Sequence, residues 1–173
     1  FFGRATEIID QHRGQVHEFK GDGLLAMWNA SDSVAATNAL AAAQAMERAM
    51  QDVLPETLPE GLEPLALGIG IEQGPVLIGS IGPAHRRTHT MLGETVTIVL
   101  RIQNMTMDLA QPVLVGECAA RQLVDQQLQS QGSYLLSGLQ APHTLFAPPH
   151  INRSVTKNQN DAPALKLLLG GRQ

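Results

Sequence analysis

The sequence predicts an α+β fold in which helices pack on one face of a mostly antiparallel sheet. Short apolar runs of strand length recur along the chain and are bounded by Gly, Pro, Asn or Asp. Longer segments between them carry apolar residues at the spacing of an amphipathic helix. At 173 residues, with 43% hydrophobic but only 3% aromatic residues, the chain can bury one core built from aliphatic side chains.

The first third of the chain predicts a helix, a hairpin and a second helix. Residues 1–13 place apolar residues among polar ones, as an amphipathic helix does. A strand at 15–19 and an apolar return strand at 24–28 flank the turn sequence KGDG. Small apolar residues repeat at helical spacing over 35–53, so this helix can lie close against a sheet. Pro55 and Pro59 predict that this helix ends and that a linker follows over 54–64.

The remainder of the chain alternates short strands with two more helices. The pattern predicts strands at 65–71, 75–81, 88–92, 112–115, 134–136 and 144–146, and helices at 95–107 and 117–128. A basic ribbon, His85-Arg86-Arg87, precedes the third of these strands. The segment 149–173 is polar over much of its length and predicts a C-terminal linker or disordered tail.

Composition excludes several classes of function. A formal net charge of −4 argues against a dedicated nucleic-acid binder, which usually shows a basic face. The single cysteine, Cys118, excludes an internal disulfide framework and suits the reducing cytoplasm, where we expect the domain to lie. No apolar run approaches the roughly 20 residues that a membrane-spanning helix needs.

Two motifs carry a resemblance to a known family. The segment EFKGDGLLAMW (18–28), followed by GIGIEQGPVLIGSIGPAHRRTHTMLGETVTIVLRIQN (68–104), resembles the catalytic domain of class III adenylate and guanylate cyclases. The resemblance covers about residues 1–148 and implies a ferredoxin-like core that lacks its first strand here. It also implies conversion of ATP or GTP to the 3′,5′-cyclic monophosphate and pyrophosphate.

The resemblance implies a site for two Mg²⁺ or Mn²⁺ ions, held by two aspartates on adjacent strands. Asp22 matches the second aspartate, and we expect the first one upstream of this chain. A carboxylate at the tip of a tight hairpin is presented to solvent, as a hard cation requires. An ordinary turn aspartate is the alternative, because Asp-Gly is a common hairpin signal.

Two further positions match the residues that read the purine base. Glu18 stands where the family's guanylate cyclases carry a glutamate, which accepts hydrogen bonds from guanine N–H groups. Thr90 stands at the partner position, where its hydroxyl can accept from the adenine amino group or donate to the guanine carbonyl. The two positions leave the choice between ATP and GTP open. Alternatively, Glu18 is a solvated strand residue and Thr90 an ordinary β-former.

The helix predicted at 95–107 should carry the residues that act in the transition state. Arg101 matches the arginine that binds the developing phosphoryl charge. Thr97, one helical turn earlier, stands where the family has an asparagine that orients the ribose. The family's cation near the position of Gly138 has no equivalent in Ser137-Gly138-Leu139.

Two functional hypotheses follow. In the first, the chain is a purine-nucleotide cyclase domain that is inactive as a fragment. It would be active as a homodimer or as a heterodimer with a chain that carries the site residues missing here. It would be the output of a larger sensor protein, which could be membrane-anchored. In the second, it is a catalytically inactive cyclase-homology module for nucleotide binding, dimerisation or regulation. A diguanylate cyclase relative is excluded because the sequence contains no Gly-Gly-Asp/Glu-Glu-Phe turn.

Overall fold

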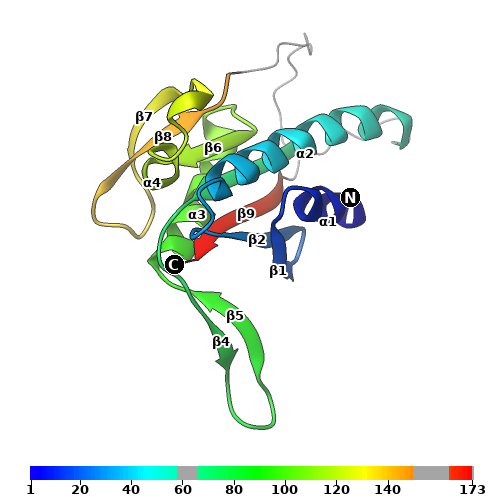
Figure 1. The fold of residues 1–173 in the computed structure, drawn as a ribbon, viewed down its shortest axis with the longest axis vertical. Helices are drawn as coiled ribbons and strands as arrows, with labels where there is room; N and C mark the ends of the chain where they lie inside the picture. The colour runs from blue at the N-terminus through cyan, green and yellow to red at the C-terminus, as the bar shows by residue number, and fades with distance from the viewer. Residues whose placement is uncertain (58–65, 150–163, 173) are drawn as a thin grey trace.

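The computed structural model describes residues 1–57, 66–149 and 164–172, which form a mixed sheet with helices on its two faces (Figure 1). The large sheet has seven strands in the order β1-β2-β9-β3-β6-β8-β7, and β4 and β5 form a separate ribbon. The strands are β1 Gln15–Lys20, β2 Gly23–Asn29, β3 Ala66–Glu72, β4 Leu77–Ile81, β5 Thr88–Leu92, β6 Val113–Gly116, β7 Gln129–Leu135, β8 Pro142–Ala147 and β9 Ala164–Arg172. The helices are α1 Phe2–Gln11, α2 Ala35–Thr57, α3 Glu94–Asp108 and α4 Glu117–Ala120, and Val124–Gln126 forms a 3₁₀ turn.

The predicted α+β class is confirmed, but the helices cover both faces of the sheet instead of one. On one face, α1 and the Ala-rich side of α2 bury alternate residues of β2, among them Leu24, Ala26 and Trp28. On the other face, α3 packs against Leu25, the next residue along β2. Because β2 is apolar without interruption, neither of its faces can be left to water. The uninterrupted apolar run LLAMW in the sequence is the signal that both faces of this strand are covered.

The large sheet combines antiparallel edges with a parallel centre. The hairpin β1–β2 and the pairs β6–β8 and β7–β8 are antiparallel, whereas β9 runs parallel to both β2 and β3. The prediction of a linker or tail over 149–173 is therefore wrong for residues 164–172. These residues form β9, which lies in the middle of the sheet (Figure 1). The pairing of β9 is a long-range contact, which local sequence patterns do not reveal. The rest of that prediction, at 150–163 and 173, lies outside the described residues.

Several predicted boundaries were wrong, and the strand predicted at 134–136 already begins at Gln129. Helix α2 continues through Pro55 to Thr57, so the predicted linker begins later than position 54. The helix predicted at 117–128 is reduced to the single turn of α4 and the separate 3₁₀ turn. The apolar residues buried there are Ala119, on α4, and Leu123, between the two turns, so their burial does not require a continuous helix.

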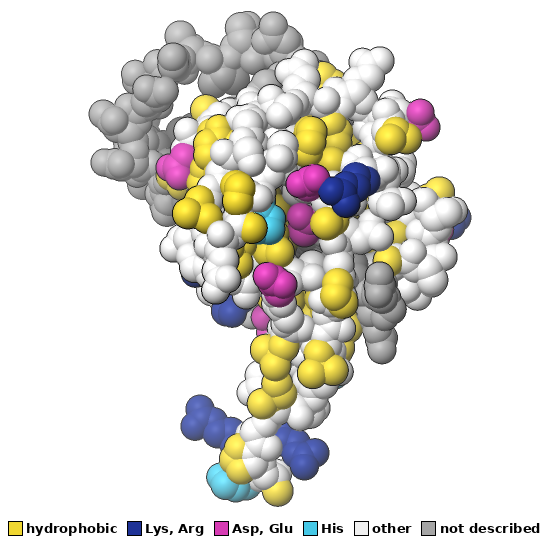
Figure 2. Space-filling model, turned by 90° about the vertical axis from the view of Figure 1, so that its left-hand side faces the viewer, with side chains coloured by type: hydrophobic (Ala, Val, Ile, Leu, Met, Phe, Trp, Pro, Cys, Tyr) yellow, Lys and Arg dark blue, Asp and Glu magenta, His cyan; other side chains and the backbone are white. Residues whose placement is uncertain are grey.

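The β4–β5 ribbon projects from the body of the molecule (Figures 1 and 2). Leu77 pairs with Leu92 at its base, and the two side chains are 69% and 44% exposed. Basic side chains gather at its tip (Figure 2), where His85, Arg86 and Arg87 form the loop. Among the described residues, no helix is both long and apolar enough to cross a membrane.

Candidate active site

The β1–β2 hairpin presents Asp22 to solvent. Lys20 pairs with Gly23, so Gly21 and Asp22 form a two-residue turn. Gly21 has φ +61°, which a residue with a side chain adopts with difficulty, and this explains the glycine at the first position of the turn. The Asp22 carboxylate is exposed at the tip of a fixed hairpin. This placement agrees with a carboxylate that can bind a hard cation.

Glu18 and Thr90 lie together although 72 positions separate them in the chain. The Thr90 hydroxyl donates to Oε2 of Glu18 over 3.4 Å. A β-bulge in β1 explains this contact, because Val16 pairs with Ala26 while Glu18 pairs with Leu25, so that His17 is an extra residue. A bulge re-aims the side chains that follow it, and here it aims Glu18 at β5.

Helix α3 places Thr97 and Arg101 one turn apart. Thr97 is exposed and Arg101 is half-buried. The Nε–H of Arg101 donates to the carbonyl oxygen of Ser137 at 2.9 Å, which ties the side chain to the loop before Gly138. This bond uses one of the five guanidinium N–H donors and leaves the terminal nitrogens free of any other described residue. They can bind an anion at the surface.

Glycines in β3 hold α3 unusually close to the sheet. A Cβ atom at Gly70 would lie 2.7 Å from the carbonyl oxygen of Val99 and 2.8 Å from the backbone nitrogen of Gln103. At the start of the helix, the Thr95 hydroxyl donates to the carbonyl oxygen of Pro75 at 2.9 Å. The position of α3, and therefore of Thr97 and Arg101, is set by its backbone contact with β3.

The structure thus brings the predicted residues together in two pairs and leaves Asp22 apart. No hydrogen bond or ion pair among the described residues joins the pair Glu18–Thr90, the pair Thr97–Arg101 and Asp22. Within the same residues, no three His, Cys, Asp or Glu side chains gather as metal ligands. Asp22 is suited to be one ligand of a divalent ion, but the described part of this chain does not assemble a complete metal site around it.

A buried carboxylate that the sequence did not single out lies at the end of β3. Glu72 is 5% exposed, and its Oε1 accepts from the backbone N–H of Gln73 at 2.8 Å and of Ala119 at 2.9 Å. Burial raises the pKa of Glu72 above its ordinary value of 4.5, while these two hydrogen bonds and nearby His143 oppose the rise. Glu72 therefore anchors α4 to β3. Its signal in the sequence is the charged residue that ends the run GIGIE.

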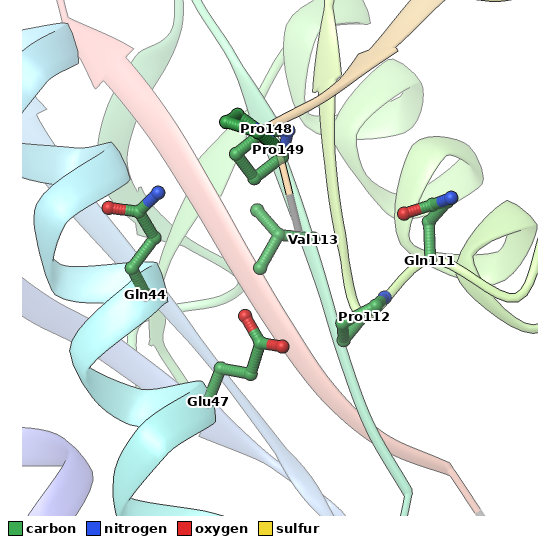
Figure 3. A pocket seen from close by; sticks show the side chains of 7 residues that line it. All are labelled: Gln44, Glu47, Gln111, Pro112, Val113, Pro148 and Pro149. Atoms are coloured by element: carbon green, nitrogen blue, oxygen red, sulfur yellow. The ribbon is translucent and has the colours of Figure 1, made fainter. Parts of the chain in front are cut away.

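Two hollows of the surface lie away from the predicted residues. One, between α2 and the start of β6, has a volume of about 10 Å³ and holds no more than one water. Its lining is shown in Figure 3 and consists of Gln44, Glu47, Gln111, Pro112, Val113, Pro148 and Pro149. The other is an open hollow of about 460 Å³ beside Arg13, Gln15 and Asn29, at the opposite end of the β1–β2 hairpin from Asp22. Neither contains a predicted site residue.

Comparison with known proteins identifies the relatives of this chain. The family model of the adenylate and guanylate cyclase catalytic domain matches residues 1–146. Adenylate cyclase 1 of Rhizobium meliloti is 30% identical over 127 residues, which are 72% of this chain and 19% of that protein. An adenylate cyclase of Anabaena cylindrica is 28% identical over 118 residues, which are 68% of this chain and 24% of that protein. The chain therefore spans about a fifth of the length of these curated relatives.

Solved structures agree with this result. The guanylyl cyclase Cya2 superposes with a TM-score of 0.72 and 27% identity, over 85% of this chain and 75% of that one. The adenylyl cyclase CyaB from P. aeruginosa superposes with a TM-score of 0.64 over 90% of this chain and 81% of that one. At 18% identity, the second likeness concerns the fold alone.

Proposed function

The chain belongs to the family of adenylate and guanylate cyclase catalytic domains, and on that premise we propose that it is a purine-nucleotide cyclase domain. It would close ATP or GTP to the 3′,5′-cyclic monophosphate and release pyrophosphate. The observation that carries the proposal is the contact between Glu18 and Thr90, because the fold joins two distant positions at which the resemblance expects the base to be read.

The residues of this chain would act on three parts of the substrate. The Glu18–Thr90 pair would bind the edge of the base, and Arg101 would bind the phosphoryl oxygens as negative charge develops on them. Thr97, on the same side of α3, would contact the ribose through its hydroxyl. Asp22 would be one ligand of two Mg²⁺ or Mn²⁺ ions, which supply charge neutralisation at the triphosphate when they are bound.

The contact in the base-binding pair gives its two members different preferences for the base. Because the Thr90 hydroxyl donates its hydrogen to Glu18, both side chains present acceptor oxygens to a ligand, and an acceptor at Thr90 suits the adenine amino group and not the guanine carbonyl. Guanine offers N–H donors on its Watson–Crick edge, whereas adenine N1 is an acceptor and would be repelled by the carboxylate. Glu18 therefore favours guanine and Thr90 favours adenine, so the ratio of cyclic GMP to cyclic AMP formed shows which of the two residues dominates.

The proposed setting is a dimer within a longer cytoplasmic protein. The two pairs and Asp22 are not joined within one chain, so a second copy or a related chain would supply the missing side of the site. We place the catalytic domain at residues 1–148 together with β9, which completes its sheet, and we propose a segment upstream that carries the other metal-binding aspartate and a sensor module. Membrane attachment, where there is any, would lie in that longer protein.

A catalytically inactive cyclase-homology module is the second candidate. It is supported by the hydroxyl of Thr97 in place of an amide, by the lack of a cation in Ser137-Gly138-Leu139, and by the isolation of Asp22 among the described residues. Such a module would still bind nucleotide or dimerise, and it would form no cyclic product.

One assay separates these two functions. A full-length protein containing this chain would be given ATP or GTP with Mn²⁺, and cyclic AMP and cyclic GMP would be quantified. Arg101→Ala should lower product formation by about 10²-fold, and Asp22→Ala should abolish it. Arg121→Ala is the matched control, because Arg121 is an exposed arginine paired with Glu117 on α4. No product from the wild type, although it binds nucleotide, would establish the inactive module.

A further inference from the structure

Two histidines face each other where the projecting ribbon meets the body of the molecule. His17 lies at the bulge of β1 and His89 lies on β5, and these strands are in contact. The ring centroids are 5.3 Å apart, and the ring planes are inclined by 44°. The bulge turns His17 toward β5 together with Glu18, whereas a regular strand would point the two side chains to opposite faces.

Each ring has a nitrogen that no described residue uses. Nε2 of His17 is buried and has no hydrogen-bond partner in the part of the chain that the structure describes. Nδ1 of His89 lies 3.5 Å from the hydroxyl of Ser80, which leaves Nε2 of His89 as the free nitrogen. A hydrogen-bonding group on the far nitrogen is the usual arrangement for a metal-binding histidine, because it fixes the tautomer and the ring orientation. A buried imidazole nitrogen without a partner is unfavourable unless a ligand satisfies it.

The distance between the rings matches a shared metal ion. Zinc–nitrogen bonds are about 2.0–2.1 Å long, and a ring nitrogen lies roughly 1.1 Å from its ring centre, so two imidazoles on one tetrahedral zinc have centres about 5.2 Å apart. The observed separation is 5.3 Å. His89 is exposed and can rotate to admit the ion.

We propose that His17 and His89 form a site for a transition-metal ion such as Zn²⁺, which joins the β4–β5 ribbon to β1. Imidazole is a preferred ligand of this class of ion, unlike the hard cations that bind carboxylates. The described residues supply two protein ligands, and water would complete the coordination. The ion would exchange with solvent on the side of the exposed His89.

A regulatory consequence follows if the proposed function holds. His17 and His89 each directly precede a member of the base-binding pair, Glu18 and Thr90. An ion that joins the two histidines would restrain both members, so nucleotide binding should change when the ion binds. The metal site itself does not depend on that function.

The test measures Zn²⁺ binding to the 173-residue chain by competition with a chromogenic chelator. Variants His17→Gln, His89→Gln and the double substitution are compared with the wild type, and circular dichroism verifies that each variant folds. His85→Gln is the matched control, because His85 is also exposed on the ribbon but lies at its tip. Loss of an outer hydrogen-bond partner of a metal ligand already weakens binding roughly 10–100-fold, so loss of a ligand should weaken it at least tenfold.

We expect one Zn²⁺ per chain in the wild type and in His85→Gln, with weaker binding in the other variants. Zn²⁺ should raise the melting temperature of the wild type and of His85→Gln, and of no other variant. Absence of binding to the wild type, or equal binding to all variants, would overturn the proposal. Neither result depends on cyclase activity.

Discussion

Replacing Gly70 by alanine tests whether close backbone contact between β3 and α3 positions the candidate active site. The added Cβ would lie 2.7 Å from the carbonyl oxygen of Val99 and 2.8 Å from the nitrogen of Gln103. Both atoms belong to the backbone of α3, so neither can move aside by a change of rotamer. Ordinary contact begins near 3.4 Å, so the helix must withdraw by roughly 0.7 Å.

The magnitude follows from this overlap. Forcing extra volume into a packed interface lowers the free energy of unfolding by about 1–3 kcal/mol. For a domain of this size that corresponds to a fall of roughly 2–12 °C in melting temperature. Because α3 carries Thr97 and Arg101, cyclase activity should fall further than the loss of folded protein explains.

Gly79→Ala is the matched control for this substitution. Gly79 also lies in a strand, β4, but a Cβ atom there would meet nothing within 4 Å. Urea unfolding gives the free energies of the two variants, and product formation is measured where both are folded. If Gly70→Ala is as stable and as active as Gly79→Ala, the closeness of α3 to β3 does not determine the site.

Three other substitutions test separate parts of the structure. Burial raises the pKa of Glu72, so the folded state holds this proton more tightly than the unfolded chain does. The free energy of unfolding should therefore fall as pH rises from 4.5 through the raised pKa, and Glu72→Gln should remove this part of the pH profile in urea titrations. Glu18→Lys should raise the ratio of cyclic AMP to cyclic GMP formed, because an ammonium can donate to adenine N1; an unchanged ratio would show that Glu18 does not read the base. Thr97→Asn should increase the turnover rate without changing the melting temperature, and an unchanged rate would show that the amide is not needed.

Local patterns predicted the elements whose residues determine their own structure. The helix expected at 95–107 forms as Glu94–Asp108 because its apolar residues repeat at helical spacing and Gly93 precedes it. The hairpin around Asp22 forms because Gly21 can adopt the left-handed conformation that the turn needs. In both cases the information lies within a few residues.

Long-range contacts could not be predicted in this way. The strand β9 contains the run ALKLLL, which is apolar except for Lys166, but its place between β2 and β3 depends on partners about a hundred positions away and more. The bulge at His17 leaves no local signal, so the contact of Glu18 with Thr90 came from the family resemblance and not from the strand pattern. The bond from Arg101 to the carbonyl of Ser137 is equally invisible in sequence.

The anchors of α3 show why the departure at Thr97 changes chemistry more than position. Thr95, two residues before it, is tied through its hydroxyl to Pro75, and Arg101, one turn after it, is tied to Ser137. Thr97 therefore lies on a turn that is held at both ends, while its own side chain is exposed. Asparagine and threonine differ little in helix propensity, so either residue would stand at the same place. What the threonine lacks is an amide, which has two N–H donors and a separate carbonyl acceptor where a hydroxyl has one donor, and the rate of the Thr97→Asn variant measures the value of that group directly.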